Sequence, residues 1–361
     1  MEIVLIYGGK SAEHEISVLT AQAIAKNIDY MKYTVQPVYI TQQGDWLAGP
    51  KLNKLPQMGW DFNLSPADHA EFKEANSTGL SVVPTDVLNA STIVFPALHG
   101  PNGEDGTIQG LFESLNVPYV GAGVLASATA MDKIISKYLF EKAGIPQLPY
   151  HALRAADWEK DPEAALDVVI NDLDLPVFVK PANLGSSVGI SRADSREDLK
   201  TAIDLALQFD RRVVLEKALD GAREIELAVM GNDDPQVSVP GELVKEQGFY
   251  DYDEKYINNT VEMAIPAPLS KELVSKLQDY AKAAYLIIDG SGLTRCDFFI
   301  TADEAIYINE VNTMPGFTQF SMYPSLWEAT GKSYSQLIAD LLELALSRYE
   351  AKQKRLNQVE H

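Results

Sequence analysis

The chain of 361 residues is long enough for two or three domains, and its 46% of hydrophobic residues is ordinary for a globular protein. With 30 Lys and Arg against 51 Asp and Glu, the formal charge is −21, which disfavours nonspecific binding to nucleic acid or to an anionic membrane. The single cysteine, Cys296, excludes an intrachain disulfide and a zinc site built from several cysteines.

The chain starts with a short apolar segment and a glycine turn, MEIVLIYGGK. No basic region precedes a long apolar run, and no stretch of 18 apolar residues occurs anywhere in the sequence. We therefore expect a cytoplasmic protein without a membrane or nucleic-acid partner.

The first third of the chain alternates short apolar strands with helices. This alternation is typical of a parallel α/β domain, which we place at residues 1–121. Residues 42–80 are polar and irregular, and we interpret them as an insertion whose role is open. The expected strands are 2–7, 33–40, 92–96 and 117–120, and the expected helices are 11–27 and one that begins near 108.

Two turns of this domain follow strands and carry polar groups, at the carboxyl ends where α/β folds bind ligands. Glu13 lies in the segment GGKSAEHEIS, and an acid there suits a cationic ligand such as an ammonium group. The alternative is a glutamate that is merely favoured by a helix N-terminus. His99 opens the loop HGPNGEDGT, although a lone histidine at such a place is more often structural.

The rest of the chain divides into two further units, at residues 122–215 and 216–361. The first is predicted to contain a helix at 127–143, strands at 149–153, 177–180 and 213–217, and helices at 162–171 and 195–208. The second is predicted to contain strands at 223–230 and 237–244, a polar and aromatic loop at 247–260, a helix at 270–286, a hairpin and a terminal helix at 333–352. Because loops of this length in compact domains are often lids, we interpret 247–260 as one.

A loop rich in glycine and serine, KPANLGSSVG, follows the strand that ends at Lys180. Its backbone N–H groups, around Ser186 and Ser187, can approach phosphate oxygens closely, and Lys180 would add a positive charge. The order G-x-x-x-x-G-K-[ST] is absent, so the loop is not a Walker A motif. The alternative for this loop is a plain surface turn. Lys133, near the start of a predicted helix, could also reach a phosphate, and its alternative is a solvated helix lysine.

A second candidate for nucleotide binding is the strand end Glu216-Lys217-Ala218-Leu219. It could form the edge of an adenine pocket, with Glu224 placed for ribose hydroxyl groups. The alternative is that these charged residues at a strand end simply face water.

The C-terminal hairpin, RCDFFI followed by AIYINEVN, carries oxygen ligands. Glu310 and Asn312 are two residues apart, so on a strand they face the same side. Folding the hairpin about Asp303 and Glu304 places Asp297 nearly opposite Glu310, about 5–6 Å away at Cα. Two carboxylates and an amide oxygen on neighbouring strands predict a cation site suited to Mg²⁺.

Beside this predicted cation site lie groups that suit an anion. Arg295 precedes Asp297 by two residues and so shares its face of the strand. After the hairpin, the turn Thr313-Met314-Pro315-Gly316 brings a backbone N–H that could join Arg295 around an anionic oxygen.

The order of these motifs resembles the D-alanine–D-alanine ligases of the ATP-grasp superfamily. The resemblance covers essentially the whole chain, through GGKSAEHEIS, HGPNGEDGTIQG, MDK, VKPANLGSSVG, EKAL, FYDYDEKY, RCDFF and NEVNTMPGFT. It implies an N-terminal α/β domain followed by a two-domain ATP-grasp fold of α+β type, with ATP between the last two domains. It also implies the ATP-dependent ligation of two D-alanines through D-alanyl phosphate, for peptidoglycan synthesis. Two Mg²⁺ or Mn²⁺ ions and a homodimer are implied as well, and a monovalent cation requirement stays undecided.

The resemblance also implies roles for individual residues. Glu13 would hold the ammonium of the first D-alanine, His99 would lie near its carboxylate, and Ser321 and Met322 would contact the second substrate. The residues implied for ATP are Lys133, Lys180, Ser187, Glu216, Lys217, Leu219, Glu224 and Lys255. Those implied for catalysis and metal binding are a hydrogen-bonded triad of Glu13, Ser186 and Tyr256, an oxyanion site of Arg295 and Gly316, and the metal ligands Asp297, Glu310 and Asn312.

Two features depart from the family pattern. The insertion at 42–80 is longer than in compact members, and the spacing from Glu216 to Glu224 is one residue longer than in some members. The nearest competing activity is a ligase that joins D-alanine to D-lactate, but relatives of that kind carry Phe in place of Tyr256 or lack the lid motif. Tyr256 therefore favours an amine nucleophile. Another carboxylate–amine ligase of the superfamily is a more distant alternative.

Two other functional classes are weaker alternatives. An NAD-dependent dehydrogenase is suggested only by the first α/β domain, and the absence of G-x-G-x-x-G argues against it. A nucleotide-binding regulator without catalysis would not need three metal ligands together with a lid.

Overall fold

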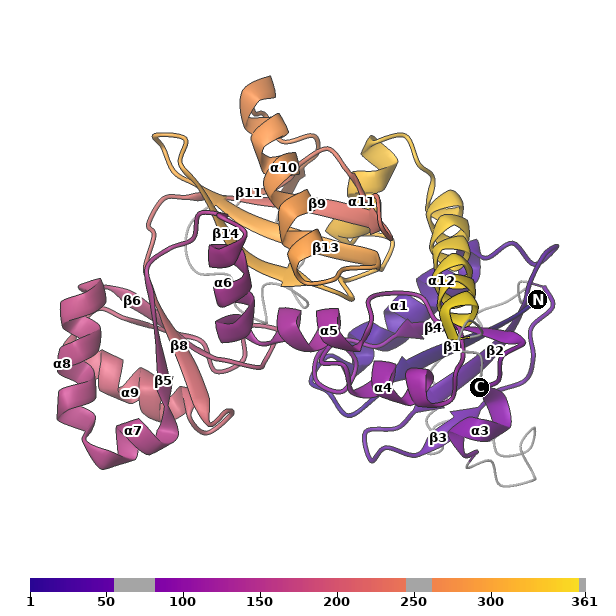
Figure 1. The fold of residues 1–361 in the computed structure, drawn as a ribbon, viewed down its shortest axis with the longest axis horizontal. Coiled ribbons are helices and arrows are strands. Elements are labelled where there is room, and N and C mark those ends of the chain that lie inside the picture. The colour runs from indigo at the N-terminus through magenta and orange to yellow at the C-terminus, as the bar shows by residue number, and fades with distance from the viewer. Residues whose placement is uncertain (55–81, 245–261, 357–361) are drawn as a thin grey trace.

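Three β-sheets with helices packed on them form the computed structural model, which describes residues 1–54, 82–244 and 262–356. The N-terminal sheet lies at the right of Figure 1, a large sheet at the upper centre, and a small sheet at the lower left. This is the mixed α/β architecture that the sequence predicts. The predicted lid, 247–260, lies outside the described residues.

The N-terminal sheet has the order β3-β2-β1-β4. Strand β1 pairs in parallel with both β2 and β4, whereas the edge strand β3 is antiparallel to β2. Because β1 lies between its two parallel partners, the turns that follow β1 and β4 lie side by side, where such sheets bind ligands. The strands are β1 (Glu2–Gly8), β2 (Thr34–Ile40), β3 (Trp46–Ala48) and β4 (Thr92–Ala97).

Glycine is required where β1 ends. Gly8 has a φ of +89°, and a Cβ atom there would lie 2.2 Å from the carbonyl oxygen of Ile40. The N–H of Gly8 donates to Ser17 Oγ at 2.7 Å, and that hydroxyl donates to the carbonyl oxygen of Ala97 at 2.5 Å. These bonds connect the ends of β1 and β4 to the first helix and fix the turns that follow the two strands.

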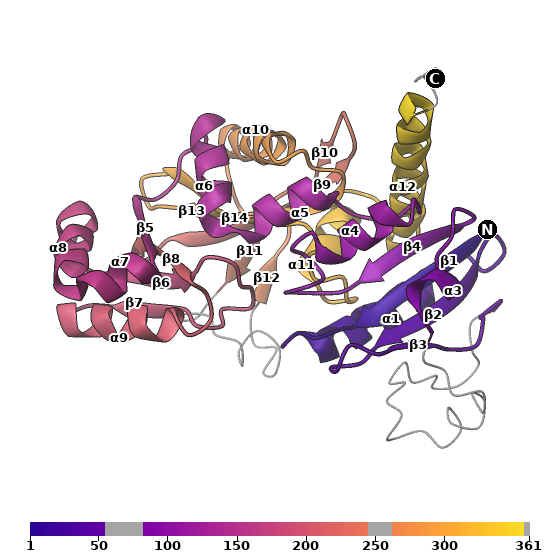
Figure 2. The same ribbon diagram turned by 60° about the horizontal axis from the view of Figure 1, so that its bottom comes forward.

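Helices from both ends of the chain cover the N-terminal sheet (Figures 1 and 2). The C-terminal helix α12 buries Leu337 and Leu341 in one core cluster with Ile3 and Leu5 of β1. The last helix thus packs in the N-terminal part, which no local pattern of the sequence indicates. The helices here are α1 (His14–Asn27), α3 (Pro84–Val87), α4 (Thr107–Ser114) and α12 (Tyr334–Leu356).

Arg348 anchors α12. Its guanidinium donates to the carbonyl oxygens of Gly121 and Tyr119, the latter at 2.9 Å, and to Ser291 Oγ at 2.5 Å. It also lies over the ring of Tyr119, with Cζ 4.3 Å from the ring centroid. One side chain therefore joins the C-terminal helix to two other parts of the chain.

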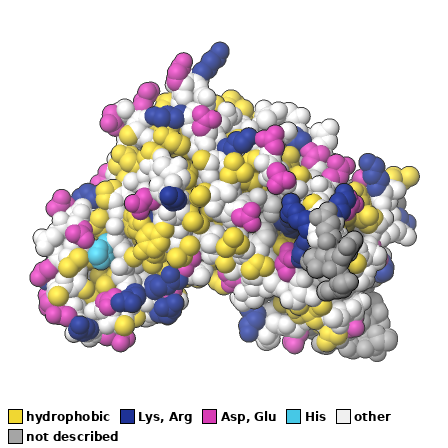
Figure 3. Space-filling model, viewed as in Figure 1, with side chains coloured by type: hydrophobic (Ala, Val, Ile, Leu, Met, Phe, Trp, Pro, Cys, Tyr) yellow, Lys and Arg dark blue, Asp and Glu magenta, His cyan; other side chains and the backbone are white. Residues whose placement is uncertain are grey.

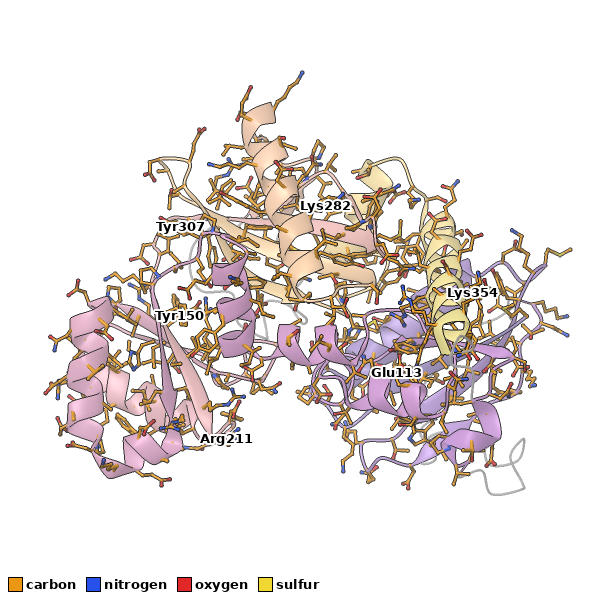
Figure 4. The ribbon with its side chains drawn as sticks, viewed as in Figure 1. Glu113, Tyr150, Arg211, Lys282, Tyr307 and Lys354 are labelled. Atoms are coloured by element: carbon orange, nitrogen blue, oxygen red, sulfur yellow. The ribbon has the colours of Figure 1, made fainter. Side chains whose placement is uncertain are left out.

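We expect Arg348→Met to lower the free energy of unfolding by about 2 kcal/mol, because buried carbonyls lose a charged donor. Urea unfolding followed by fluorescence would measure it. The control is Lys354→Met, which removes the same charge from an exposed position of α12 (Figure 4). Equal unfolding midpoints for the two variants would contradict the anchoring role.

The large sheet has the order β12-β11-β9-β13-β14, with β10 paired to β9, and its ladders are antiparallel. Helix α10 packs on it through Leu277, Ala281 and Tyr285. Its strands are β9 (Arg223–Gly231), β10 (Gln236–Val237), β11 (Gly241–Val244), β12 (Glu262–Ala264), β13 (Gly292–Ile300) and β14 (Ile306–Asn312). Its helices are α10 (Lys271–Ile287) and α11 (Met322–Ala329).

The small sheet has the order β5-β8-β6-β7 and is also antiparallel. Helices α8 and α9 cover one face of it with Val169, Leu199 and Ile203. Its strands are β5 (Tyr150–Arg154), β6 (Val177–Pro181), β7 (Ser191–Ala193) and β8 (Arg212–Lys217). Its helices are α7 (Ala155–Lys160), α8 (Pro162–Leu173) and α9 (Arg196–Ala206).

Three predicted elements were wrong in detail. The helix expected at 127–143 is two helices, α5 (Val124–Met131) and α6 (Lys133–Lys142), because the side chain of Asp132 accepts the N–H groups of Ile134 and Ile135 and starts a new helix. The strand expected at 237–244 is split into β10 and β11 around Pro240, which has no N–H to donate. The strand expected at 117–120 is reduced to a single bridge, Val94 with Tyr119.

The connecting helices α5 and α6 fall within the predicted unit 122–215, together with the small sheet, but they pack on the large sheet. Ala126 and Ala130 of α5 and Phe140 of α6 belong to the core cluster of the large sheet, not to that of the small sheet. The limits at 121 and 215 remain predictions.

Among the described residues, no helix combines the length and the apolar character needed to cross a membrane. Acidic and basic side chains are interspersed over the face shown in Figure 3, without a continuous basic surface.

Candidate active site

Among the described residues, a cavity of about 1210 Å³ gathers side chains from the small sheet, the large sheet, helix α1 and the turns that follow β1 and β4. Each predicted site residue within the described part of the chain lines it: Glu13, His99, Lys133, Lys180, Ser186, Ser187, Glu216, Lys217, Leu219, Glu224, Arg295, Asp297, Glu310, Asn312, Gly316, Ser321 and Met322. Lys255 and Tyr256 lie outside the described residues. The individual roles of these residues remain predictions.

The hairpin β13–β14 brings the predicted metal ligands together through a β-bulge. Asp297 pairs directly with Glu310, but the next pair is Phe298 with Ile308, so Asn309 is the extra residue. The turn is one residue tighter than a hairpin folded about Asp303 and Glu304, and the bulge restores the predicted pairing. It also allows Asn309 and Glu310, which are neighbours in sequence, both to line the cavity.

Arg295 is held at the centre of this face by two carboxylates. Its Nε and Nη2 donate to the two oxygens of Asp297 at 2.7 and 2.6 Å, and Nε lies 2.9 Å from Glu226 Oε2. Burial opposes the charge on the guanidinium, but Asp297 and Glu226 outweigh it and raise the pKa of Arg295. Arg295 therefore stays a cation within the cavity wall.

The donor set fits a divalent cation. Asp297 and Glu310 face each other across the ladder, and Asn312 Nδ2 lies 3.0 Å from Asp297 Oδ2, so three oxygen-bearing side chains converge. Carboxylate and amide oxygens are the ligands that Mg²⁺ and Mn²⁺ prefer. Within residues 1–54, 82–244 and 262–356, no group of three or more His, Cys, Asp or Glu side chains could hold a metal ion, and the predicted set combines two carboxylates with one amide.

Lys133 connects this hairpin to the small sheet. It is the first residue of α6, and its N–H donates to the carbonyl oxygen of Ala182 at 2.8 Å. Its Nζ donates to the carbonyl oxygen of Leu184 at 2.6 Å and lies 3.7 Å from Glu310 Oε2. A lysine in this place is a fixed cation beside the predicted metal ligands.

Lys180 and Glu216 belong to a buried charged triad that the sequence did not reveal. Glu216 on β8 forms ion pairs with Lys180 of β6 and with Lys137 of α6, whose side chain is only 2% exposed. Lys137 Nζ also lies 5.1 Å from the ring centroid of Tyr150, which is labelled between the small sheet and α6 in Figure 4. In the sequence, only the four-residue spacing from Lys133 to Lys137, which places both on one face of a helix, could have suggested a role for Lys137.

The charge states of this triad follow from its burial and its pairing. Burial disfavours the charged form of Glu216, but Lys137 and Lys180 outweigh it and lower the pKa of Glu216 to about 2. Burial likewise opposes the charge on Lys180, and Glu216 reverses this and raises the pKa of Lys180. Glu216 is therefore an internal counter-ion.

The glycine- and serine-rich loop adopts a rare backbone. Ser186 and Ser187 have φ values of 55° and 58°, in the left-handed region that residues other than glycine seldom occupy. Ser186 Oγ is buried and has no hydrogen-bond partner among the described residues. A Cβ atom at Gly185 would lie 3.7 Å from Glu13 Oε2, so the loop and the N-terminal turn meet.

His99 is a neutral wall residue in this structure. Its Nδ1 lies 3.0 Å from the carbonyl oxygen of Met314, so Nδ1 carries the proton, and Nε2 accepts from Thr20 Oγ1 at 2.9 Å. Burial lowers the pKa of His99. The two ring nitrogens thus link helix α1 to the segment that follows the hairpin.

Glu104 is a second residue that the sequence reasoning missed, although it lies in the loop that His99 opens. It lines the cavity, and its Oε2 accepts the N–H of Gly100 at 3.2 Å. Burial and the nearby Glu13 raise the pKa of Glu104 well above its usual range. In the sequence, the acidic residues of HGPNGEDGT could have suggested a site role for Glu104.

The remaining predicted residues line the cavity from two other segments of the chain. In the segment after the hairpin, Ser321 Oγ accepts the N–H of Thr318 at 2.9 Å, close to Gly316, where a Cβ atom would lie 3.1 Å from that oxygen. Met322 there is largely buried in the core. In the segment from β8 to β9, Leu219 and Glu224 line the cavity, and Lys217 Nζ donates to the carbonyl oxygen of Leu175 at 3.4 Å.

Comparisons with known proteins agree with this geometry. Two family models match, D-ala D-ala ligase N-terminus at residues 2–122 and D-ala D-ala ligase C-terminus at residues 139–343. The D-alanine--D-alanine ligase of Enterococcus faecalis (strain ATCC 700802 / V583) is 51% identical over 350 residues, which cover 97% of this chain and 100% of that protein. The D-alanine--D-alanine ligase of Enterococcus hirae is 50% identical over 353 residues, which cover 98% of each chain.

Solved structures give the same result for the fold. The D-alanine-D-alanine ligase from Coxiella burnetii has a TM-score of 0.83 and 31% identity, and the match covers 99% of this chain and 97% of that one. The VanG D-Ala:D-Ser ligase from Enterococcus faecalis has a TM-score of 0.77 and 32% identity, with 95% and 99% covered. These matches confirm the ATP-grasp fold, and the chain belongs to the D-alanine–D-alanine ligase family.

Proposed function

We propose that this chain joins two molecules of D-alanine into D-alanyl-D-alanine for peptidoglycan synthesis, with conversion of ATP to ADP and phosphate. The observation that carries the proposal is the cavity of about 1210 Å³ described above. In it, Glu13 of the N-terminal turn, Lys180 of the small sheet and the Asp297–Glu310 pair of the large sheet line one space. The reaction needs these three kinds of group: an acid that binds an ammonium, lysines that bind phosphates, and oxygen ligands that bind a cation.

In the first half of the proposed reaction, a carboxylate oxygen of the first D-alanine attacks the γ-phosphorus of ATP and ADP leaves. The product, D-alanyl phosphate, has the leaving group that a carboxylate lacks. Phosphoryl transfer depends mainly on positioning and charge neutralisation, which Lys133 and Lys180 supply from fixed positions. A divalent cation held by Asp297, Glu310 and Asn312 would neutralise further phosphate charge when bound.

In the second half, the amine of the second D-alanine attacks the acyl carbon, and phosphate leaves the tetrahedral intermediate. Arg295 and the N–H of Gly316 are the groups proposed to stabilise its oxyanion. The attacking amine must lose a proton, and the buried hydroxyl of Ser186 together with Tyr256 is the proposed relay.

Several finer points of the proposal rest on the family alone. An acyl phosphate hydrolyses in water, so residues 247–260 are proposed as a lid that carries Lys255 and Tyr256. The proposal further includes Mg²⁺ or Mn²⁺ as the cation, room for a monovalent cation, a homodimer and a cytoplasmic location.

The proposal predicts that ADP and phosphate are released with D-alanine at a rate at least about 100-fold above that with L-alanine. Coupled ADP release would measure the rate, and mass spectrometry of the product would identify a D-alanine dipeptide. D-serine and D-lactate, each mixed with D-alanine, are the comparison arms, because a relative of similar fold is named a D-Ala:D-Ser ligase. If the enzyme preferred to join D-alanine to D-serine or D-lactate over forming D-alanyl-D-alanine, the proposed second substrate would be refuted. ADP release with L-alanine only would refute D-alanine as the substrate.

A further inference from the structure

A buried carboxylate without a part in the proposed reaction lies beside Arg295. Glu226 is on β9, where its ladder partner on β13 is Asp297. Its side chain is only 8% exposed and lines the same cavity. Nothing in a strand core calls for an acid, since burying an unpaired carboxylate is costly. A buried Glu226 therefore needs a positive group nearby to offset its charge. Arg295 provides it, with Nε 2.9 Å from Glu226 Oε2.

Glu226 completes a row of acids across three neighbouring strands. Glu226 pairs with Asp297, and Asp297 pairs with Glu310, so the three carboxylates follow one another from β9 to β13 to β14. Neighbouring strands lie about 4.8 Å apart, so Glu226 and Glu310 are about 10 Å apart at the backbone. Glu226 is thus at the end of the row far from Lys133, on the side of Arg295.

Asp297 has two possible partners for the same oxygens. In this structure Arg295 donates to both of them, at 2.7 and 2.6 Å. Under the proposed function, Asp297 also supplies oxygen to a divalent cation, which would compete with the guanidinium for it. Glu226 is two strands away from Glu310, whereas Asp297 is directly opposite it, so Glu226 is farther from this part of the predicted metal site.

We propose that Glu226 is a positioning residue, which holds the guanidinium of Arg295 at the reacting end of the cavity when Asp297 turns its carboxylate to the cation. This inference rests on the proposed function. Glu226 does not touch the reacting atoms; it acts through Arg295. A displacement of about 1 Å in a group that stabilises charge can cost about 100-fold in rate, so a small change in Arg295 would be measurable.

The test compares Glu226→Gln, Glu226→Asp and Arg295→Lys in the full chain, with Glu304→Gln at the exposed hairpin turn as the control. We expect Glu226→Gln to lower kcat about 10- to 100-fold, with the KM values for ATP and D-alanine changed less than about threefold. Glu226→Asp keeps the charge and should recover part of kcat. In the Arg295→Lys background, Glu226→Gln should lower kcat by less than about threefold, since the group that it positions is already altered.

A second readout separates positioning from metal binding. Mn²⁺ alone, titrated by electron paramagnetic resonance, should bind the Glu226→Gln variant with unchanged affinity, whereas Asp297→Asn should weaken it. Weaker Mn²⁺ binding by Glu226→Gln, a kcat equal to that of Glu304→Gln, or a full additional loss in the double variant would each overturn the inference. If Glu226→Gln does not fold, kcat is compared for Glu226→Asp in the wild-type background and in the Arg295→Lys background. An equal loss of kcat in both backgrounds would overturn the inference. Absence of D-alanine-dependent ADP release by the wild-type chain would instead refute the proposed function.

Discussion

Replacing Glu310 by Gln is expected to lower the rate of D-alanine ligation at least about 100-fold, the size of effect found when one charge-stabilising group is removed from an active site. Glu310 is the carboxylate that the bulge at Asn309 turns towards Asp297 and the cavity. It also lies 3.7 Å from Lys133, so the change removes a counter-ion as well as a predicted metal ligand.

The measurement is the initial rate of ADP release at several Mg²⁺ concentrations. We expect the Mg²⁺ concentration for half-maximal rate to rise together with the fall in rate. Glu304→Gln is the matched control, because it makes the same chemical change on the same hairpin at an exposed turn. A nearly normal rate for Glu310→Gln at limiting Mg²⁺ would show that this carboxylate is not a ligand.

The pairing of Asp297 with Glu310 was predictable because it depends on short-range rules. Side chains alternate along a strand, and a hairpin turn sets which residues face each other. The bulge at Asn309 was not predictable, since no residue of INEVN marks it, and the pairing was correct only because the tighter turn and the bulge offset each other. Strands β1, β2 and β4 of the N-terminal sheet were predictable for the same local reasons, whereas the edge strand β3 lies in the segment that we interpreted as an irregular insertion.

Two of the residues that sequence reasoning missed, Lys137 and Glu226, contact residues from distant segments. Lys137 matters because β8 brings Glu216 against α6, and Glu226 matters because β9 lies beside β13. Neither neighbourhood follows from a local pattern. Glu226 could still have been suggested, because it follows Glu224 by two residues and so shares its face, as Asn312 shares that of Glu310. The packing of α12 on the N-terminal sheet is a long-range feature of the same kind.

Replacing Glu216 by Gln is expected to lower the free energy of unfolding by about 3–5 kcal/mol, because it leaves Lys137 and Lys180 buried without their shared counter-ion. Urea unfolding would measure the loss, and Glu159→Gln, an exposed carboxylate on α7, is the control. Lys137→Met in the Glu216→Gln background should restore part of the stability, since one unpaired cation is removed.

The same loss should depend on pH in a defined direction. The pKa of Glu216 is lowered from 4.5 to about 2 in the folded chain, so its contribution to stability is complete above pH 4.5 and disappears as the pH falls through about 2. The difference in unfolding free energy between wild type and Glu216→Gln should therefore be constant near neutral pH and should narrow in that acid range. A difference that stays constant down to pH 2, or a Lys137→Met change that adds to the loss, would show that Glu216 is not the counter-ion of the two lysines. Such a result would also remove the reason for treating Lys180 as a cation that is held in place before ATP binds.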